Sequence, residues 1–176
     1  MNGKYKFTGK TKNDFGVVLH QIVALKDFGD VKKGDIGGWI EKESNLDILG
    51  NAWVSGNACV YGNARVSGDA WVSGNARVYG DARVYGDARV YGDARVSGGQ
   101  WDKSPLYIQG TKYSICMCAP KTLKIGCKTY TIDQWLRHGE SIAKTEKFAE
   151  EEIEEYRAYV ELAAKLYPEE KLKCTT

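Results

Sequence analysis

The sequence predicts a mainly-β protein: a short left-handed parallel β-helix with an N-terminal cap and a small α+β module after it. Three observations predict this class. A six-residue unit repeats nine times between Ile48 and Trp101. Nearly every unit holds an aliphatic residue and an alanine at fixed positions, and Gly followed by Asn or Asp ends it. A fixed period of this kind is typical of solenoid proteins, whose repeats stack on one another.

Each hexad reads as a short strand followed by a turn. In the unit 76–81, ARVYGD, alternation directs Ala and Val to one side of the strand and Arg77 and Tyr79 to the other. Gly-Asp supplies the turn, because Gly tolerates positive φ and Asp bonds its own backbone. Three such strands close a triangle of 18 residues. The hexads therefore predict three 18-residue coils over residues 48–102, with Ala and Val lining the bore.

Residues 1–47 are predicted to cap the first coil. The segment 5–8 alternates like a strand, 17–25 is a broken apolar run, and 36–40 (IGGWI) leads toward the first coil. A cap is needed because an open solenoid end exposes unpaired strand edges and an apolar bore.

Residues 103–176 are predicted to form a strand-and-helix module. Thr131 stands where a helix N-cap would be, and the second helix places Ile153, Tyr156 and Val160 on one face before Pro168 ends it. The expected strands are 106–109, 112–118, 122–125 and 128–131, and the expected helices are 132–143 and 149–167.

The repeat [aliphatic]-x-Gly-[Asn/Asp]-Ala-x resembles the hexapeptide-repeat, left-handed β-helix family, whose best-known members are trimeric acyltransferases. Residues 19–46, LHQIVALKDFGDVKKGDIGGWIEKESNL, resemble the cap in a branch of that family common in tailed phages and enterobacteria. Members of this branch are labelled acyltransferase or polymer-forming protein, and their function is undemonstrated. The resemblance implies a homotrimer that, if phage-encoded, acts in the host cytoplasm.

Composition excludes several classes of function. The net charge is +2, and no block is basic enough to predict bulk binding of duplex DNA. No apolar run reaches membrane-spanning length, and the polar N-terminus lacks the apolar core of a signal peptide. Five cysteines, an odd number, favour a reducing compartment, so we expect a cytoplasmic protein.

The 18-residue spacing sorts the outward side chains into three faces. Face one carries Trp53, Trp71 and Arg89 on successive coils. Two stacked tryptophans are too large and apolar to remain in water, so we expect a subunit interface there, or the seat of a terminal segment. The alternative is that the tryptophans only stabilise the ladder by stacking.

The other two faces carry arginine and tyrosine. Arginine offers a planar fork to phosphate or carboxylate, and tyrosine offers a stacking plane, so these rows suit an anionic, nucleotide-type ligand between subunits. The alternative is a solvated ladder in which the arginines pair with the turn acids Asp81, Asp87 and Asp93. The predicted ligand residues are Arg77, Tyr79 and Arg95 on face two and Arg65, Arg83 and Tyr85 on face three, which also includes Leu49 and Trp101.

A catalytic or metal site is not predicted. Acyl transfer needs a general base, and the hexads contain no histidine; the chain has only His20 and His138. Zinc could bind Cys116, Cys118 and Cys127 with His138, but their spacing is not that of a zinc ribbon. We therefore expect no catalytic residue, no metal and no cofactor.

The sequence favours a non-enzymatic, phage-encoded binding protein. Its sharpest form is a counter-defence protein that sequesters a nucleotide-type anion at subunit interfaces. A protein-binding inhibitor of a host protein, or an oligomeric scaffold, is the second hypothesis. A hexapeptide-type acyltransferase with His20 as its base is the third.

Overall fold

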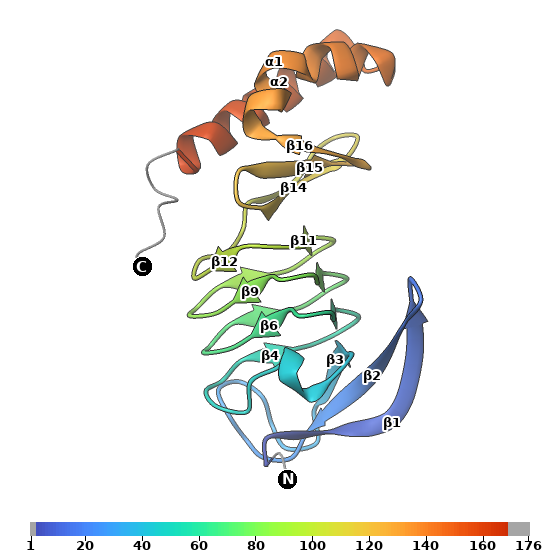
Figure 1. Cartoon of the computed structure of the whole chain (residues 1–176), viewed down its shortest axis with the longest axis vertical. Helices are drawn as coiled ribbons and strands as arrows, with labels where there is room; N and C mark the ends of the chain where they lie inside the picture. The colour runs from blue at the N-terminus through green and yellow to red at the C-terminus, as the bar shows by residue number, and fades with distance from the viewer. Residues whose placement is uncertain (1–2, 169–176) are drawn as a thin grey trace. The chain divides into compact units, whose positions relative to one another are not determined.

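The computed structural model describes residues 3–168 (Figure 1). The chain divides into two compact units, one ending at Pro105 and the other beginning at Leu106, and each is described by itself. The first unit is the N-terminal cap and the parallel β-helix; the second is a four-stranded antiparallel sheet with two helices. The predicted mainly-β class is confirmed, and the winding is consistent with a left-handed β-helix.

Parallel strands two residues long form the three faces of the β-helix. Strands one coil apart pair in register, as in Trp53↔Trp71 and Cys59↔Arg77, so the predicted sorting of the regular hexads into faces is confirmed. Face one is the sheet of β4(Trp53–Val54), β7(Trp71–Val72) and β10(Arg89–Val90); face two contains β5(Cys59–Val60), β8(Arg77–Val78) and β11(Arg95–Val96); face three is β6(Arg65–Val66), β9(Arg83–Val84) and β12(Gln100–Trp101).

The bore is filled by the residues that the hexad pattern directs inward. Every alanine and valine of the repeat is at most 1% exposed, at positions 52 to 94 for alanine and 54 to 96 for valine. Burial of this continuous small-residue core, together with the interstrand hydrogen bonds, holds the coils in one stack.

The corners are stabilised by side-chain amides that donate to acids one coil later. Asn63 donates to Asp81 at 3.1 Å, and Asn75 donates to Asp93 at 3.1 Å. These two turn acids therefore have amide partners. The glycine before each turn Asn or Asp adopts positive φ, as in Gly74 at +70°, where a Cβ would lie 3.0 Å from the Gly92 nitrogen.

The β-helix begins earlier than the hexads indicate and makes roughly four turns instead of three. Ile40, in β3(Ile36–Ile40), pairs with Val60, and Leu46 bridges to Val66 after a short 3-10 helix, η1(Glu43–Asn45). Leu46 takes the inward place, and Ile48 and Leu49 are 48% and 73% exposed. In a regular hexad the turn glycine follows the inward aliphatic residue by two positions, but Gly50 follows Leu46 by four. Two extra residues therefore bulge out at this corner.

The last rung also departs from the prediction. Trp101 pairs with Val84, 17 residues earlier, so it occupies an inward position and is 5% exposed. The turn at 97–99 is one residue shorter than in the other hexads, and a one-residue shift moves a side chain to the opposite face. Trp101 therefore fills the end of the bore and does not belong to the outer surface of face three.

Side chains in the cap replace the hydrogen bonds that a preceding coil would make. Backbone N–H groups of each coil point to the next coil, as in Trp53 N to Ala70 O, so the first coil is left with carbonyls that lack partners. Lys4 Nζ donates to Ala52 O at 2.7 Å and Asp47 O at 3.1 Å. The Tyr5 hydroxyl lies 3.0 Å from Leu46 O. Buried carbonyls are expensive to leave unpaired, so these contacts stabilise the start of the β-helix.

Lys4 is expected to titrate close to neutral pH. It is 1% exposed, and its burial lowers the pKa of the amine from 10.5 to about 8. The unfolded chain keeps the higher pKa, so the burial penalty is complete below pH 8 and disappears as pH rises from 8 to 10.5. Relative to Lys4→Met, the wild-type protein should gain about 2 kcal/mol of unfolding free energy between pH 7.5 and 9.5.

Urea denaturation of the wild-type protein and of Lys4→Met between pH 7.5 and 9.5 measures the difference in unfolding free energy. Thiols and phenols titrate in both proteins, so their contribution cancels in this difference. The Lys4 amine should also show an NMR titration midpoint close to 8. A stability difference that stays constant with pH would contradict the assignment.

The remaining cap is a long hairpin of β1(Tyr5–Asp14) and β2(Val17–Ala24), which pair antiparallel. β2 pairs with β3, so the hairpin extends the sheet of face two. The pairing shifts register between Phe7 and Thr11, around Gly9 with φ of +90°, and the distal half bends back along the coils (Figure 1). β1 is an edge strand, and Lys6, Lys10 and Lys12 on it oppose edge-to-edge aggregation.

The second unit matches the predicted elements closely. The sheet follows the order β13(Tyr107–Gln109), β14(Ser114–Ala119), β15(Thr122–Ile125), β16(Lys128–Thr131), and the helices are α1(Ile132–Thr145) and α2(Glu150–Leu166). The predicted N-cap is confirmed, because Thr131 Oγ1 accepts from Gln134 N at 3.2 Å. Trp135 of α1 donates to Leu123 O at 3.0 Å and ties the helix to the sheet. Neither helix is long and apolar enough to cross a membrane within the described residues.

Candidate binding faces

Face two is occupied by the chain's own hairpin. Arg77 of β8 donates from Nε and Nη2 to the two carboxylate oxygens of Asp14, at 2.8 and 2.9 Å. Its guanidinium also lies 5.3 Å from the ring centre of Phe15, at the hairpin tip. Lys12 adds a cation–π contact with Trp39 at 4.6 Å. These contacts hold the distal hairpin against the β-helix (Figure 1).

The electrostatics of this pair agree with its geometry. The two side chains are only 24% and 14% exposed. The hydrogen bond from Arg77 lowers the pKa of Asp14, and the same bond raises the pKa of Arg77. A bidentate, half-buried arginine–carboxylate pair is stronger than an ordinary surface ion pair.

The predicted ligand site on face two is therefore closed in this structure. Asp14 occupies the guanidinium N–H donors of Arg77 that a ligand would need, and Tyr79 stacks on Tyr61 with ring centres 5.3 Å apart. Arg95 is half-buried one rung beyond Arg77. The sequence did carry a signal for the turn, because Asp14-Phe15-Gly16 separates two extended segments. The bend that brings the turn over face two depends on tertiary pairing.

Face three remains open in the first unit. Arg65 and Arg83 are exposed and stand directly one above the other, and Tyr85 is half-buried beside Arg83. Arg65 lies 3.6 Å from Asp47. No carboxylate in residues 3–168 lies within ion-pair distance of Arg83. Like charges on adjacent strands repel, and an anion placed between them relieves that cost.

The two tryptophans predicted on face one have different surroundings. Trp53 is 2% exposed and packs edge-to-face on Phe28 of the cap, with ring centres 5.4 Å apart. The chain's own N-terminal segment thus covers Trp53, which agrees with the predicted seat of a terminal segment and not with a subunit interface at this residue. Trp71 is half-buried and donates from Nε1 to the Ser55 hydroxyl at 3.0 Å. Its role in an oligomer interface stays a prediction.

The candidate residues for catalysis and metal binding belong to the hairpin of the first unit and to the second unit. His20 stacks on Phe7 within the hairpin at 4.8 Å, and His138 is exposed on α1. Cys116 and Cys118 are buried on β14, and burial raises the pKa of the Cys118 thiol, which disfavours the thiolate. Within residues 3–168 no group of three or more potential metal ligands gathers.

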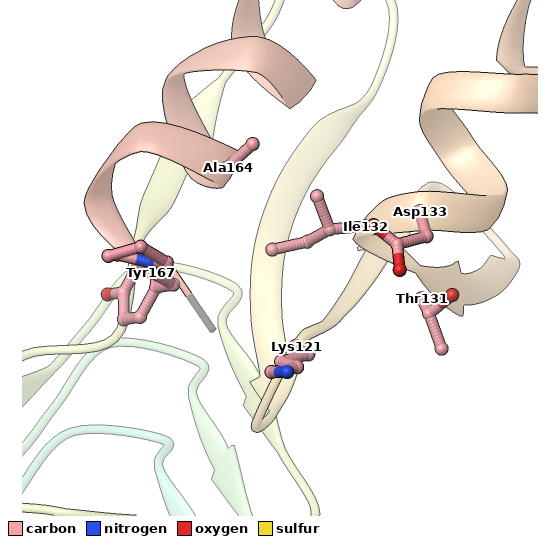
Figure 2. A pocket seen from close by; sticks show the side chains of 7 residues that line it. Lys121, Thr131, Ile132, Asp133, Ala164 and Tyr167 are labelled. Carbon is pink, nitrogen blue, oxygen red and sulfur yellow. The ribbon is translucent and has the colours of Figure 1, made fainter. Parts of the chain in front are cut away.

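The second unit contains a pocket of about 280 Å³ that the sequence did not indicate (Figure 2). Thr131, Ile132 and Asp133 at the start of α1 lie across from Ala164 and Tyr167 at the end of α2, with Lys121 at the rim. Two of its polar groups already serve the fold. Thr131 caps α1, and the Tyr167 hydroxyl accepts from Leu106 N at 3.1 Å. The pocket therefore offers a ligand few free polar groups.

The fold and faces define a parallel β-solenoid of hexapeptide repeats. Four stretches match the family model described as the YdcK Beta solenoid repeat, at residues 58–74, 70–86, 76–90 and 88–103. The repeats thus carry the pattern of that family, which supports the resemblance to hexapeptide-repeat β-helix proteins.

One similar protein is the Uncharacterized acetyltransferase YdcK of Escherichia coli (strain K12). It is 46% identical over 50 residues, which are 28% of this chain and 14% of the relative. The chain thus matches about one seventh of the relative's length. The relative is bacterial and its name specifies no ligand, so phage origin and nucleotide binding remain predictions.

Proposed function

We propose that this chain is a non-catalytic binding protein that holds an anionic partner on face three. The observation that carries the proposal is Arg83, which is exposed, lacks a carboxylate partner within residues 3–168 and lies on the rung next to Arg65. Tyr85 borders the same spot and can contact an aromatic or apolar part of the partner. Arginine is suited to this role because its planar fork binds carboxylate or phosphate in two-point fashion.

Face three is preferred to the other faces because the chain itself leaves it open. The hairpin takes Arg77 on face two, and the cap covers Trp53 on face one. We also propose a homotrimer, as the family resemblance implies. A trimer would multiply the number of face-three sites and raise the avidity for a repeated partner.

Acetyl transfer is the second candidate function. The name of the similar E. coli protein favours it, together with 46% identity over 50 residues. Acyl transfer needs a general base close to the acceptor. The hexads supply no histidine, and the ring of His20 is stacked on Phe7, so a base would have to come from elsewhere.

Native mass spectrometry after incubation with cell extract tests the proposal. The wild-type protein should retain an added mass, Arg83→Ala should lose it, and Arg89→Ala should keep it. Arg89 is a matched control because it sits in an identical DARVYG hexad, is exposed, and belongs to face one. The same spectra report the subunit number.

Two outcomes would contradict this function. Retention by Arg83→Ala equal to wild type would remove face three from the site. Turnover of acetyl-CoA on a panel of amine and hydroxyl acceptors, lost on His20→Ala, would establish the acetyltransferase instead.

A further inference from the structure

The chain contains its own example of what an Ala-Arg-Val-Tyr-Gly unit binds. On face two, Arg77 receives the carboxylate of Asp14 on its fork and the ring of Phe15 on its guanidinium face. The two binding groups are neighbours in sequence. They come from a turn 63 residues away, so this is a tertiary contact of the kind that a separate protein segment could also make.

The turn is built to present both groups together. Phe15 and Gly16 adopt positive φ, at 50° and 86°, which is the conformation of a tight two-residue hairpin turn. Asn13 Oδ1 accepts from Gly16 N at 2.9 Å and secures it. A rigid turn loses little entropy on binding, and this makes a small contact area sufficient.

Face three presents the same receptor unit without an occupant. Residues 76–80 and 82–86 are both Ala-Arg-Val-Tyr-Gly, and Arg77 and Arg83 hold the same place in their strands. Arg77 is paired with Asp14, whereas Arg83 is exposed and has no carboxylate partner in the described part of the chain.

We propose that face three binds a protein segment in which a carboxylate residue directly precedes an aromatic residue in a tight turn. Arg83 takes the carboxylate on its fork and the ring on its guanidinium face, and Arg65 adds a second positive charge one rung away. This inference rests on the proposed function and names the class of its partner.

The charge distribution favours a single carboxylate over a polyphosphate. On face three, Asp47 lies 3.6 Å from Arg65 and offsets part of its charge, whereas no carboxylate in residues 3–168 lies within ion-pair distance of Arg83. A polyphosphate carries several charges and is normally held by several cations or by backbone amides. One unpaired arginine matches one carboxylate, and the adjacent ring supplies cation–π attraction.

Face three is also a better receptor than face one. Arg89 repeats the same unit, but the rung before it carries Trp71, whereas Arg83 has Arg65 at that position. A second cation strengthens the attraction for a carboxylate, and a tryptophan does not. Arg83 and Arg89 therefore form a matched pair of sites that differ mainly in the residue on the preceding rung.

The probe is a synthetic peptide of residues 11–20 with cysteines in place of Thr11 and His20. These two residues face each other across the hairpin, so a disulfide between the new cysteines closes the peptide in its turn conformation. We would titrate it into the full-length isotope-labelled chain and follow the backbone amides and arginine side chains by NMR. The expected result is saturable shifts at Arg83 and Tyr85 with a Kd on the order of 1 mM.

Matched variants on both partners decide the assignment. In the peptide, Asp14→Asn and Phe15→Ala should each weaken binding about tenfold, since each removes one of the two contacts with the guanidinium. In the protein, Arg83→Ala should abolish the shifts and Arg89→Ala should leave them unchanged. A peptide that binds equally well without its carboxylate or its ring would overturn the inference.

A parallel titration with ATP separates this inference from the proposed function. Saturation of Arg83 by ATP without any response to the peptide would overturn the peptide partner and leave face three as an anion site. Shifts by the peptide centred on Arg89 or Arg77 would overturn the choice of face. If the chain shows no NMR shifts with the peptide or with ATP, and retains no added mass from cell extract, both proposals are refuted.

Discussion

Replacing Trp53 with alanine is expected to lower the unfolding free energy by about 3–5 kcal/mol, the usual cost of removing a fully buried tryptophan. The indole is 2% exposed, meets Phe28 edge-to-face and lies tightly over Gly37, where a Cβ would be 2.7 Å from the ring. Its loss leaves a cavity between the cap and the first coil. Urea denaturation followed by circular dichroism measures the change at constant protein concentration.

Trp71→Ala is the matched control one rung further along face one. Trp71 is half-buried and makes one hydrogen bond with Ser55, so its removal should cost about 1–2 kcal/mol. The pair also distinguishes internal packing from a subunit interface. If Trp53→Ala kept its unfolding free energy and lost subunits instead, the indole would belong to an oligomer contact.

Asn45→Ala should destabilise the protein by about 3 kcal/mol, because it leaves buried carbonyls without donors. Asn45 is fully buried, and its amide donates to Ala64 O at 2.8 Å and Gly62 O at 3.2 Å. Its Oδ1 accepts from Lys42 N at 2.9 Å. The side chain thus completes the corner where a preceding coil would otherwise pair. Thermal and urea unfolding give the stability of the variant.

Asn63→Ala provides the control for this substitution. Asn63 is exposed, and among the described residues its amide donates to the turn acid Asp81 alone, so its loss should change the unfolding free energy by less than about 0.5 kcal/mol. Asn45→Asp adds a stricter test, since a carboxylate of similar shape would face two carbonyl oxygens. A variant Asn45→Asp as stable as wild type would show that the amide does not cap the β-helix.

Because the repeat is regular, much of the fold of this protein could be predicted from its sequence. A period of six with Ala and Val at fixed places determines which side chains enter the bore, because the alternation within each short strand leaves no other arrangement. It likewise determines the three faces, since strands 18 residues apart must pair. The N-cap of the first C-terminal helix and the apolar face of the second are local signals too, and the predicted cap at Thr131 is confirmed for that reason.

The positions of side chains at the irregular ends of the β-helix could not be predicted from the hexad pattern. The hexad spacing predicts Trp101 on the outer surface, yet the shortened turn before it moves the side chain into the bore. The same spacing leaves Leu46 in the cap, yet this residue fills the first inward position of face three. A single inserted or deleted residue reverses the direction of every following side chain, and the hexad pattern does not reveal where such a change is absorbed.

The candidate site shows the same division. The sequence by itself determined that arginine and tyrosine would line two faces, because their spacing follows the repeat. Which face stays open was decided by tertiary structure alone: the hairpin bends around Gly9 and brings Asp14 to Arg77, 63 residues away. A contact between distant segments depends on a bend and a register that no local pattern encodes. Arg77 and Arg83 therefore have the same local sequence and different surroundings.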